Sequence, residues 1–337
     1  MDTVIEVKDL CKEFKVYHHR KGFAGAFVNL FSRQHKIVRA VDGISFTVQR
    51  GEVVGYIGPN GAGKSTTIKM LTGILVPTSG YLTVNGYVPH RERKENAKRI
   101  GVVFGQRTHL WFDLPVQESF DLLRHIYQIP MKLYRENLER FDSILELHHF
   151  FQTPVRQLSL GQRMRADIAA ALLHNPDVLF LDEPTIGLDV VAKERIRQFI
   201  RQINAERQVT IILTTHDLND VEKLCERVIL IDSARILYDG KLVAIRKLLS
   251  RERLLIVDYA EEYAYVELRH AVISHQEKTG VHYRFSLHEN SIAELIGEML
   301  ERFRIVDLSV QEPEIEEVVR AIYERKLSLE QQVRVPL

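Results

Sequence analysis

A glycine-rich loop with a fixed order of residue types constrains this chain most. The loop fits the pattern Gly-x-x-x-x-Gly-Lys-Ser, follows an apolar run predicted as a strand (53–57) and precedes a run predicted as a helix (67–71). Its residues are Gly58, Pro59, Asn60, Gly61, Ala62, Gly63, Lys64, Ser65 and Thr66. Glycines let the backbone N–H groups approach phosphate oxygens, and the helix directs its positive end at the same anion. The sequence therefore predicts a nucleoside triphosphate site.

Two side chains of this loop have predicted roles of their own. Lys64 is expected to act as a point charge on the β- and γ-phosphates, and the Ser65 hydroxyl as a Mg²⁺ ligand. The alternative, an ordinary glycine-rich turn, is disfavoured because a strand-like run and a helix-like run stand on the two sides of the loop.

Bulk properties limit the class of protein. A chain of 337 residues with 45% hydrophobic content suggests two domains with real cores, and a net charge of +1 gives no overall field that favours nucleic acid or a membrane. Cys11 and Cys225 lie too far apart in sequence to suggest a disulfide framework, so a reducing compartment is expected. The N-terminus lacks a secretory core, and no apolar run approaches the ~20 residues that a membrane-spanning helix needs. We expect a cytoplasmic protein.

Apolar runs at 100–104, 177–182 and 210–214 are predicted as buried strands. Parallel sheets place ligand-binding residues at the carboxyl ends of their strands. The second of these runs ends in Asp182, with Glu183 directly after it, and the third ends shortly before His216. A strand-like segment over 44–48, and a hairpin predicted from 78–84 into the turn pair Asn85-Gly86, indicate antiparallel strands beside the core. From 116 to 172 the periodicity is mostly helical, with breaks at Pro130 and Pro154. The predicted fold is α/β, with an antiparallel β subdomain and an inserted helical subdomain over about 107–172.

The last part of the chain differs in character. A charged run near 246–253 suggests a boundary, and we predict a first domain over 1–248 and an accessory α+β domain over 249–337. The accessory domain shows no catalytic cluster. Near the other end, a basic segment over 18–39 contains the short apolar stretch 23–31, which is expected either to pack on its own domain or to lie on a membrane surface or partner.

Several spaced motifs carry a family resemblance. The segment 158–162 reads Leu-Ser-Leu-Gly-Gln, 181–184 reads Leu-Asp-Glu-Pro, and 187–189 reads Gly-Leu-Asp. These three segments resemble, in that order, the signature, the Walker B motif and the D-loop of an ABC transporter ATP-binding subunit. Gln106 stands at the place of the Q-loop glutamine, His216 at that of the switch histidine, and the phosphate loop resembles Walker A. The resemblance covers about residues 4–248. The resemblance implies a P-loop NTPase core and the cofactors ATP and Mg²⁺.

The resemblance also implies residue roles at the site of hydrolysis. Asp182 is expected to hold Mg²⁺ through water, and Glu183 to orient and deprotonate the attacking water. His216 would contact the γ-phosphate, and Gln106 would contact Mg²⁺ and the attacking water. The alternative is a purely structural role for the two acids, in which one of them caps the N-terminus of a helix; it is disfavoured in a chain that binds a triphosphate.

The signature implies a pair of chains. In this family the signature caps the nucleotide of the opposite subunit, so Ser159, Gly161 and Gln162, with the D-loop Asp189, are expected at the seam of a homodimer or heterodimer. Leu160 replaces the family's first glycine, and leucine adopts a positive φ or a close backbone approach less easily. By itself the segment also fits an ordinary helix start with Ser159 as N-cap.

The adenine platform has two candidates. The family stacks an aromatic of the early antiparallel region on the base, and Phe14 and Tyr17 both qualify, although either could instead be core. We expect an ATPase subunit on the cytoplasmic face of the membrane that powers a separate permease, most similar to drug-efflux export systems, with no nucleic acid partner. An importer subunit and a soluble ABC ATPase are the alternatives. The stretch 107–120, with Trp111 and Phe112, is predicted either to contact the permease or to pack within the helical subdomain.

Overall fold

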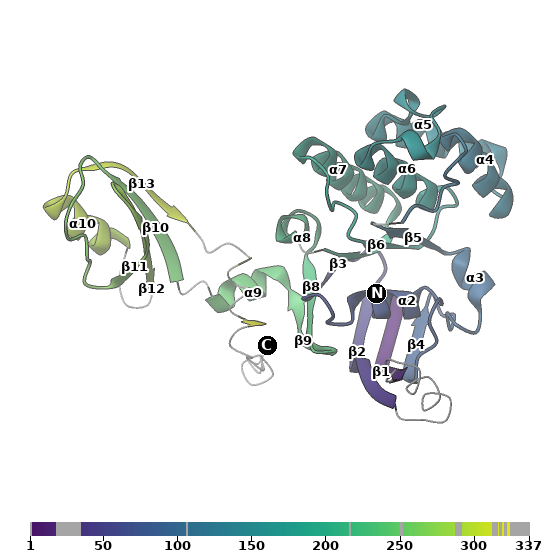
Figure 1. Cartoon of the computed structure of the whole chain (residues 1–337), viewed down its shortest axis with the longest axis horizontal. Helices are drawn as coiled ribbons and strands as arrows, with labels where there is room; N and C mark the ends of the chain where they lie inside the picture. Colours follow the sequence, from purple (N-terminus) through teal and green to yellow (C-terminus); the bar gives the residue numbers. More distant parts are fainter. Residues whose placement is uncertain are drawn as a thin grey trace, which may run out of the picture. The chain divides into compact units, whose positions relative to one another are not determined.

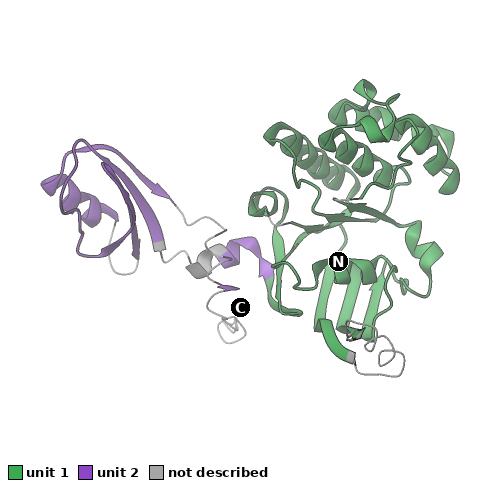
Figure 2. Ribbon diagram, in the orientation of Figure 1, with its two compact units in different colours: residues 1–239, 329–337 green, residues 240–328 purple. Residues whose placement is uncertain are grey.

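A computed structural model describes residues 2–17, 35–105, 107–215, 217–249, 252–286 and 292–311, together with residues 316, 319, 322 and 323. The chain divides into two compact units that meet in sequence at residues 239 and 240 (Figure 2). The predicted change of domain lay at 248, so helix α9 (Leu242–Leu249), which the sequence assigned to the first domain, falls in the second unit.

The first unit is organised by a six-stranded sheet with the order β5-β6-β7-β3-β8-β9 (Figure 1). Its strands are β3 (Val53–Ile57), β5 (Ile100–Phe104), β6 (Val178–Asp182), β7 (Thr210–Thr214), β8 (Arg227–Asp232) and β9 (Arg235–Lys241). The neighbours from β5 to β8 pair in parallel. These strands are nearly continuous apolar runs because both faces of a parallel sheet are covered. The α/β prediction is confirmed.

A second sheet of the same unit is antiparallel and has the order β2-β1-β4. It consists of β1 (Thr3–Tyr17), β2 (His35–Gln49) and β4 (Ser79–Val84). The predicted turn at Asn85-Gly86 is present, with positive φ at both residues, but only a single bridge, Val84 to Tyr87, follows it. The partner of β4 is β1, so the expected local hairpin is replaced by a long-range pairing.

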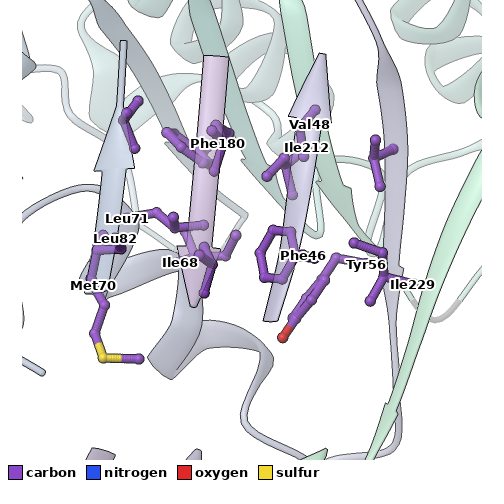
Figure 3. Packing of buried hydrophobic residues seen from close by; sticks show 14 of the residues in the cluster. Phe46, Val48, Tyr56, Ile68, Met70, Leu71, Leu82, Phe180, Ile212 and Ile229 are labelled. Carbon is purple, nitrogen blue, oxygen red and sulfur yellow. The ribbon is translucent and has the colours of Figure 1, made fainter. Parts of the chain in front are cut away.

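Helix α2 (Lys64–Leu71) lies against the antiparallel sheet and contributes to one core with both sheets. Figure 3 shows side chains from the antiparallel sheet, from α2 and from the parallel strands gathered in a single cluster. Among them, Phe46 and Tyr56 have ring centroids 5.9 Å apart. This shared core holds the loop between β3 and α2 in place.

Helices fill the rest of the first unit. They are α3 (Arg93–Ala97), α4 (Val116–Ile126), α5 (Met131–Leu145), α6 (Leu160–Leu172), α7 (Val190–Arg207) and α8 (Leu218–Leu224), with short 3₁₀ turns η1 (Leu147–His149) and η2 (Val155–Gln157). The prolines expected to break the helical region stand at boundaries, with Pro130 before α5 and Pro154 before η2. Proline fits there because it has no N–H to offer a preceding turn.

The second unit contains a four-stranded antiparallel sheet with the order β11-β12-β10-β13. Its elements are β10 (Glu252–Tyr259), β11 (Ala271–Glu277), β12 (Gly280–Ser286), helix α10 (Ile292–Arg302) and β13 (Ile305–Gln311). A core of its own includes Tyr283 and Met299, both fully buried. The tyrosine hydroxyl donates to the carbonyl oxygen of Val266 at 2.6 Å.

The described helices include none that combines the length and the apolar character needed to cross a bilayer. The apolar stretch 23–31, predicted to pack locally or to contact a membrane, lies outside the described residues.

Candidate functional site

The loop between β3 and α2 is built so that only glycine fits at two of its positions. Gly63 has a φ of 108°, and a Cβ there would lie 2.3 Å from the carbonyl oxygen of Ala40. A Cβ on Gly58 would lie 2.5 Å from the carbonyl oxygen of Ile231. Both distances are far below van der Waals contact. Steric limits therefore dictate these two glycines and bring the backbone of the loop close to strands far away in sequence.

Lys64 is the first residue of α2 and is only 6% exposed. Its ammonium donates to the carbonyl oxygens of Gly58 and, at 3.2 Å, of Pro59. Burial lowers the pKa of Lys64 below its ordinary value, and the nearby carboxylates of Asp182 and Glu183 oppose that shift. The cation is thus folded over the loop, at the point where an anion on the loop would need neutralising.

Asp182 joins three elements of the site. Its carboxylate at the end of β6 accepts a hydrogen bond from Ser65 Oγ at 3.2 Å and another from the hydroxyl of Thr214 at the end of β7. Thr214 was not among the predicted residues. Its position as the last residue of an apolar strand beside β6 was the signal that could have identified it.

Glu183 follows directly and has a φ of 57°, which is uncommon for a residue with a side chain. Its backbone N–H donates to the carbonyl oxygen of Thr214 at 2.9 Å. A Cβ on Gly105, which follows β5, would lie 2.3 Å from the carbonyl oxygen of Glu183, so that neighbour must be glycine. Strain of this kind persists where surrounding contacts enforce it, often at functional sites.

A cavity of about 360 Å³ opens at these strand ends. Ser65, Asp182 and Glu183 line it, together with Lys69, Ile74, Phe104, Gly105 and Arg107. The structure thus brings the phosphate loop and both predicted acids together at one edge of the sheet.

Ser159 and its neighbours form a second, separate surface. Ser159 caps α6: its Oγ accepts from the backbone N–H of Gln162 at 3.2 Å, and its own N–H donates to the side chain of Gln162 at 2.9 Å. The reciprocal pair fixes the first turn of the helix. Asp189 caps α7 with a single hydrogen bond, which its carboxylate accepts from the backbone N–H of Ala192 at 2.8 Å. A cavity of about 560 Å³ lies between the two helix starts.

Leu160, the residue that departs from the family pattern, causes no backbone strain. It is the first residue of α6 and is absent from the residues with positive φ. Its side chain approaches the D-loop, because a Cβ on Gly187 would lie 3.0 Å from Leu160 Cδ2. Gly187 has a φ of 70°, a conformation that favours glycine over residues with a side chain.

A buried charge cluster supports the loop between β7 and α8. Asp220, fully buried, accepts from Arg197 Nε at 2.6 Å and from the hydroxyl of Thr185, two residues after Glu183. Lys193 pairs with Asp217 at 2.6 Å. This cluster joins α7, α8 and the loop after β6. It could not be predicted from sequence, because charged residues on amphipathic helices are usually exposed.

The remaining predicted residues are placed as follows. Gln106 and His216 lie outside the described residues, as does the side chain of Tyr17. Phe14 is 37% exposed near the end of β1, opposite Val38 of β2, and Lys12 Nζ lies 5.2 Å from its ring centroid. The ring of Phe14 is therefore partly exposed, with the Lys12 ammonium over it.

Comparison with known proteins agrees with this geometry. The family model described as ABC transporter matches residues 41–186. The chain is 35% identical over 212 residues to the ABC transporter ATP-binding protein NatA of Bacillus subtilis (strain 168). The aligned region covers 63% of this chain and 86% of NatA. This chain is a member of the ABC transporter family. It is an ATP-binding subunit with ATPase activity.

Two further members of the family extend the comparison. The linearmycin resistance ATP-binding protein LnrL of Bacillus subtilis (strain 168) is 32% identical over 287 residues, covering 82% of this ABC subunit and 91% of LnrL. The dimeric, post-hydrolysis structure of the ATP-binding cassette MJ0796, bound to ADP and Pi, has a TM-score of 0.59 and 27% identity, over 71% of this chain and 98% of that one. ATP-binding cassettes of this family dimerise and work with membrane permease components.

Proposed function

We propose that two copies of this subunit, or one copy and a sibling, pack head to tail on ATP and drive a separate permease for export. In the proposed domain plan, residues 1–248 form the ATPase domain and residues 249–337 an accessory domain. One observation carries the head-to-tail arrangement. Among the described residues, none lines both the cavity at Ser65, Asp182 and Glu183 and the cavity at Ser159 and Asp189. The exposed Ser159 is therefore available to a nucleotide held by another chain.

The residues at the first cavity fit Mg²⁺. Mg²⁺ is bound in phosphate sites by one or two protein oxygens plus phosphate and water, rather than by a protein cage. Ser65 Oγ and Asp182 Oδ2 are hard oxygen donors 3.2 Å apart. Within the described ranges no cluster of three or more His, Cys, Asp or Glu side chains could hold a metal, which agrees with so small a ligand set. Ser65, Asp182 and Gln106 would hold the ion, which neutralises charge on the phosphates when bound.

Each side chain of the site then has one proposed task. Glu183 takes a proton from the attacking water, and Lys64 neutralises the β- and γ-phosphates. His216 contacts the γ-phosphate from the loop that follows β7. Ser159, Gly161 and Gln162 cap the γ-phosphate of the opposite chain with the N-terminus of α6 behind them, and Asp189 fixes the start of α7 at the same seam. Phe14 is the proposed adenine platform, since its ring is partly exposed.

Export is supported by the resistance function in the name of LnrL, to which most of this chain aligns. The proposed permease contact is the segment around Trp111 and Phe112, which are 39% and 55% exposed. Exposed aromatic side chains are enriched at protein interfaces. A substrate-binding protein in the purified complex would indicate import instead.

A mixing experiment tests the shared site. Ser159→Arg blocks the cap and Lys64→Ala disables the phosphate loop, so each variant alone should be inactive. In a mixed dimer the loop of the first variant meets the cap of the second, and one of the two sites is intact. Random mixing of equal amounts should therefore restore up to about a quarter of the wild-type ATPase rate, since half of the dimers are mixed and each has one good site.

Phosphate release from the separate and mixed variants is the measurement. Ser159 is exposed, so Ser159→Arg is expected to lose only the helix cap, about 1 kcal/mol of stability. Thermal melting of both variants serves as the control for folding. Two folded variants that restore no activity on mixing would contradict the head-to-tail arrangement.

A further inference from the structure

Asp167 is a buried carboxylate that none of the proposed roles uses. It lies on α6 and is 3% exposed. Its Oδ1 accepts a hydrogen bond from Thr108 Oγ1 at 2.7 Å and another from the backbone N–H of His109 at 3.1 Å. One carboxylate oxygen thus ties the middle of α6 to a segment nearly sixty residues earlier in the chain.

The segment that Asp167 holds is anchored at its other end in the hydrolysis site. The backbone N–H of Gly105 donates to the carbonyl oxygen of Asp182 at 2.7 Å, and that of Arg107 donates to the carbonyl oxygen of Phe104 at 2.9 Å. Thr108 Oγ1 also accepts from the N–H of Leu110 at 3.1 Å, which closes a local turn. Residues 107–110 therefore connect α6 to the end of β5, and Gly105 in turn bonds that strand end to the end of β6.

Helix α6 connects Asp167 to the signature. Asp167 follows Ser159 by eight residues, about 12 Å along a helix. The reciprocal cap between Ser159 and Gln162 fixes the first turn, and buried Met164 and Ile168 hold the helix in the core. A displacement at Asp167 therefore moves Ser159 as well, because the helix between them moves as a rigid body.

We propose that Asp167 is a positioning residue that couples the ATP site of one chain to the cap it presents to the other. Through Thr108 and His109, the carboxylate fixes α6, and with it Ser159, relative to the strand end that bears Asp182 and Glu183. The inference rests on the proposed function, because the cap matters only if Ser159 meets a nucleotide on another chain.

The chemistry of the position favours a role beyond packing. Burial raises the pKa of Asp167 to about 6, although its two hydrogen bonds and the charge of Arg163 oppose that shift. His109 and His174, which line the same cavity of about 280 Å³, have pKa values lowered by burial, so no cation from either stabilises the carboxylate at neutral pH. A buried carboxylate with this pKa costs stability, and an apolar residue of similar size would avoid that cost.

The test uses the full chain with Glu183→Gln, which traps ATP without turnover, and measures ATP-driven dimerisation and ATP binding separately. Asp167→Ala removes both hydrogen bonds, and Thr108→Val removes the one from the hydroxyl while the N–H of His109 stays bonded. Both variants should weaken dimerisation in ATP within about 5- to 150-fold, the usual range of coupling between sites, and Asp167→Ala should weaken it more. ATP binding by the single chain should not change. Asp167→Asn keeps an acceptor oxygen and should restore dimerisation. Ile168→Val, which removes one buried methyl group from the same helix and leaves both hydrogen bonds of Asp167 in place, is the matched control.

Each outcome of this experiment either supports or overturns the inference. Dimerisation of Asp167→Ala and Thr108→Val equal to that of the parent overturns the inference, as does an equal loss of ATP binding and dimerisation. If Asp167→Ala does not fold, Thr108→Val alone decides, because it leaves the carboxylate in place. A parent chain that binds ATP but does not dimerise overturns the proposed function first, and the coupling with it.

The pH dependence of stability gives an independent check on the buried charge. The folded pKa of Asp167, about 6, lies above the ordinary carboxyl value of 3.8, so the folded state disfavours the ionised form. The cost is absent below pH 3.8, grows between 3.8 and about 6, and is complete above. Relative to wild type, Asp167→Asn should gain up to about 100-fold in the folding equilibrium across that window, since each pKa unit is tenfold. Denaturant melts at pH 4 and pH 7.5 measure it, and His109, His174 and Arg163, present in both proteins, cancel in the comparison.

Discussion

Glu183→Gln should retain ATP and lose most of its turnover, by about 10²- to 10⁴-fold, because the attacking water loses its base. Glutamine matches glutamate in size, and the backbone at position 183 is held by the hydrogen bond from its N–H to Thr214. The change therefore removes proton transfer with little effect on shape. Phosphate release measures turnover, and a fluorescent ATP analogue measures binding.

The matched control is Glu118→Gln, the same chemical change at an exposed position in the first turn of α4. It should leave both quantities unchanged. A Glu183→Gln protein that hydrolyses ATP at nearly the wild-type rate would remove Glu183 from the proposed mechanism and direct attention to another base.

Lys64→Ala should weaken ATP binding by about 100-fold or more. Two unit charges 4 Å apart interact by roughly 4 kcal/mol at an effective dielectric of 20, a factor of about 10³ in affinity. Part of that gain is offset, because the burial that lowers the pKa of Lys64 is relieved when the charge is removed. The measurement is the equilibrium dissociation constant of ATP in the presence of Mg²⁺.

Lys69→Ala is the control for Lys64→Ala. Lys69 belongs to the same helix and lines the same cavity, but it is exposed, so its charge is screened by water. Equal losses of affinity in the two variants would show that general charge, rather than the position of Lys64 on the loop, attracts the nucleotide.

The parallel strands could be predicted from sequence because each is a nearly continuous apolar run. The long antiparallel strands could not. Only 4–8 and 44–48 alternate cleanly, whereas β1 runs from Thr3 to Tyr17 and β2 from His35 to Gln49. Register shifts at four places along β1 and β2 break the period of two. Bulges of this kind are fixed by the partner strand and leave little trace in the sequence.

The residues of the candidate site likewise fall into a group that could be predicted from sequence and a group that could not. The phosphate loop and the acids at 182 and 183 could be identified because each motif is local. Gly105 and the charge cluster around Asp220 could not, since their significance depends on neighbours from other elements. Thr214 was not predicted, although its place at the end of an apolar strand was a signal for it. The predicted roles of His216 and Gln106 stay predictions, because both residues lie outside the described part of the chain.

By itself, the sequence determined that this chain has a triphosphate-binding loop, a parallel core and a signature segment, because backbone sterics and hydrophobic periodicity act over a few neighbouring residues. The tertiary structure decided which side chains meet. The hydrogen bonds from Ser65 to Asp182 and from Thr108 to Asp167 span 117 and 59 residues of sequence. Such contacts form only when the sheets and helices pack around a common core. Residues far apart in sequence become neighbours only once the chain between them has folded back, and no local pattern specifies that folding.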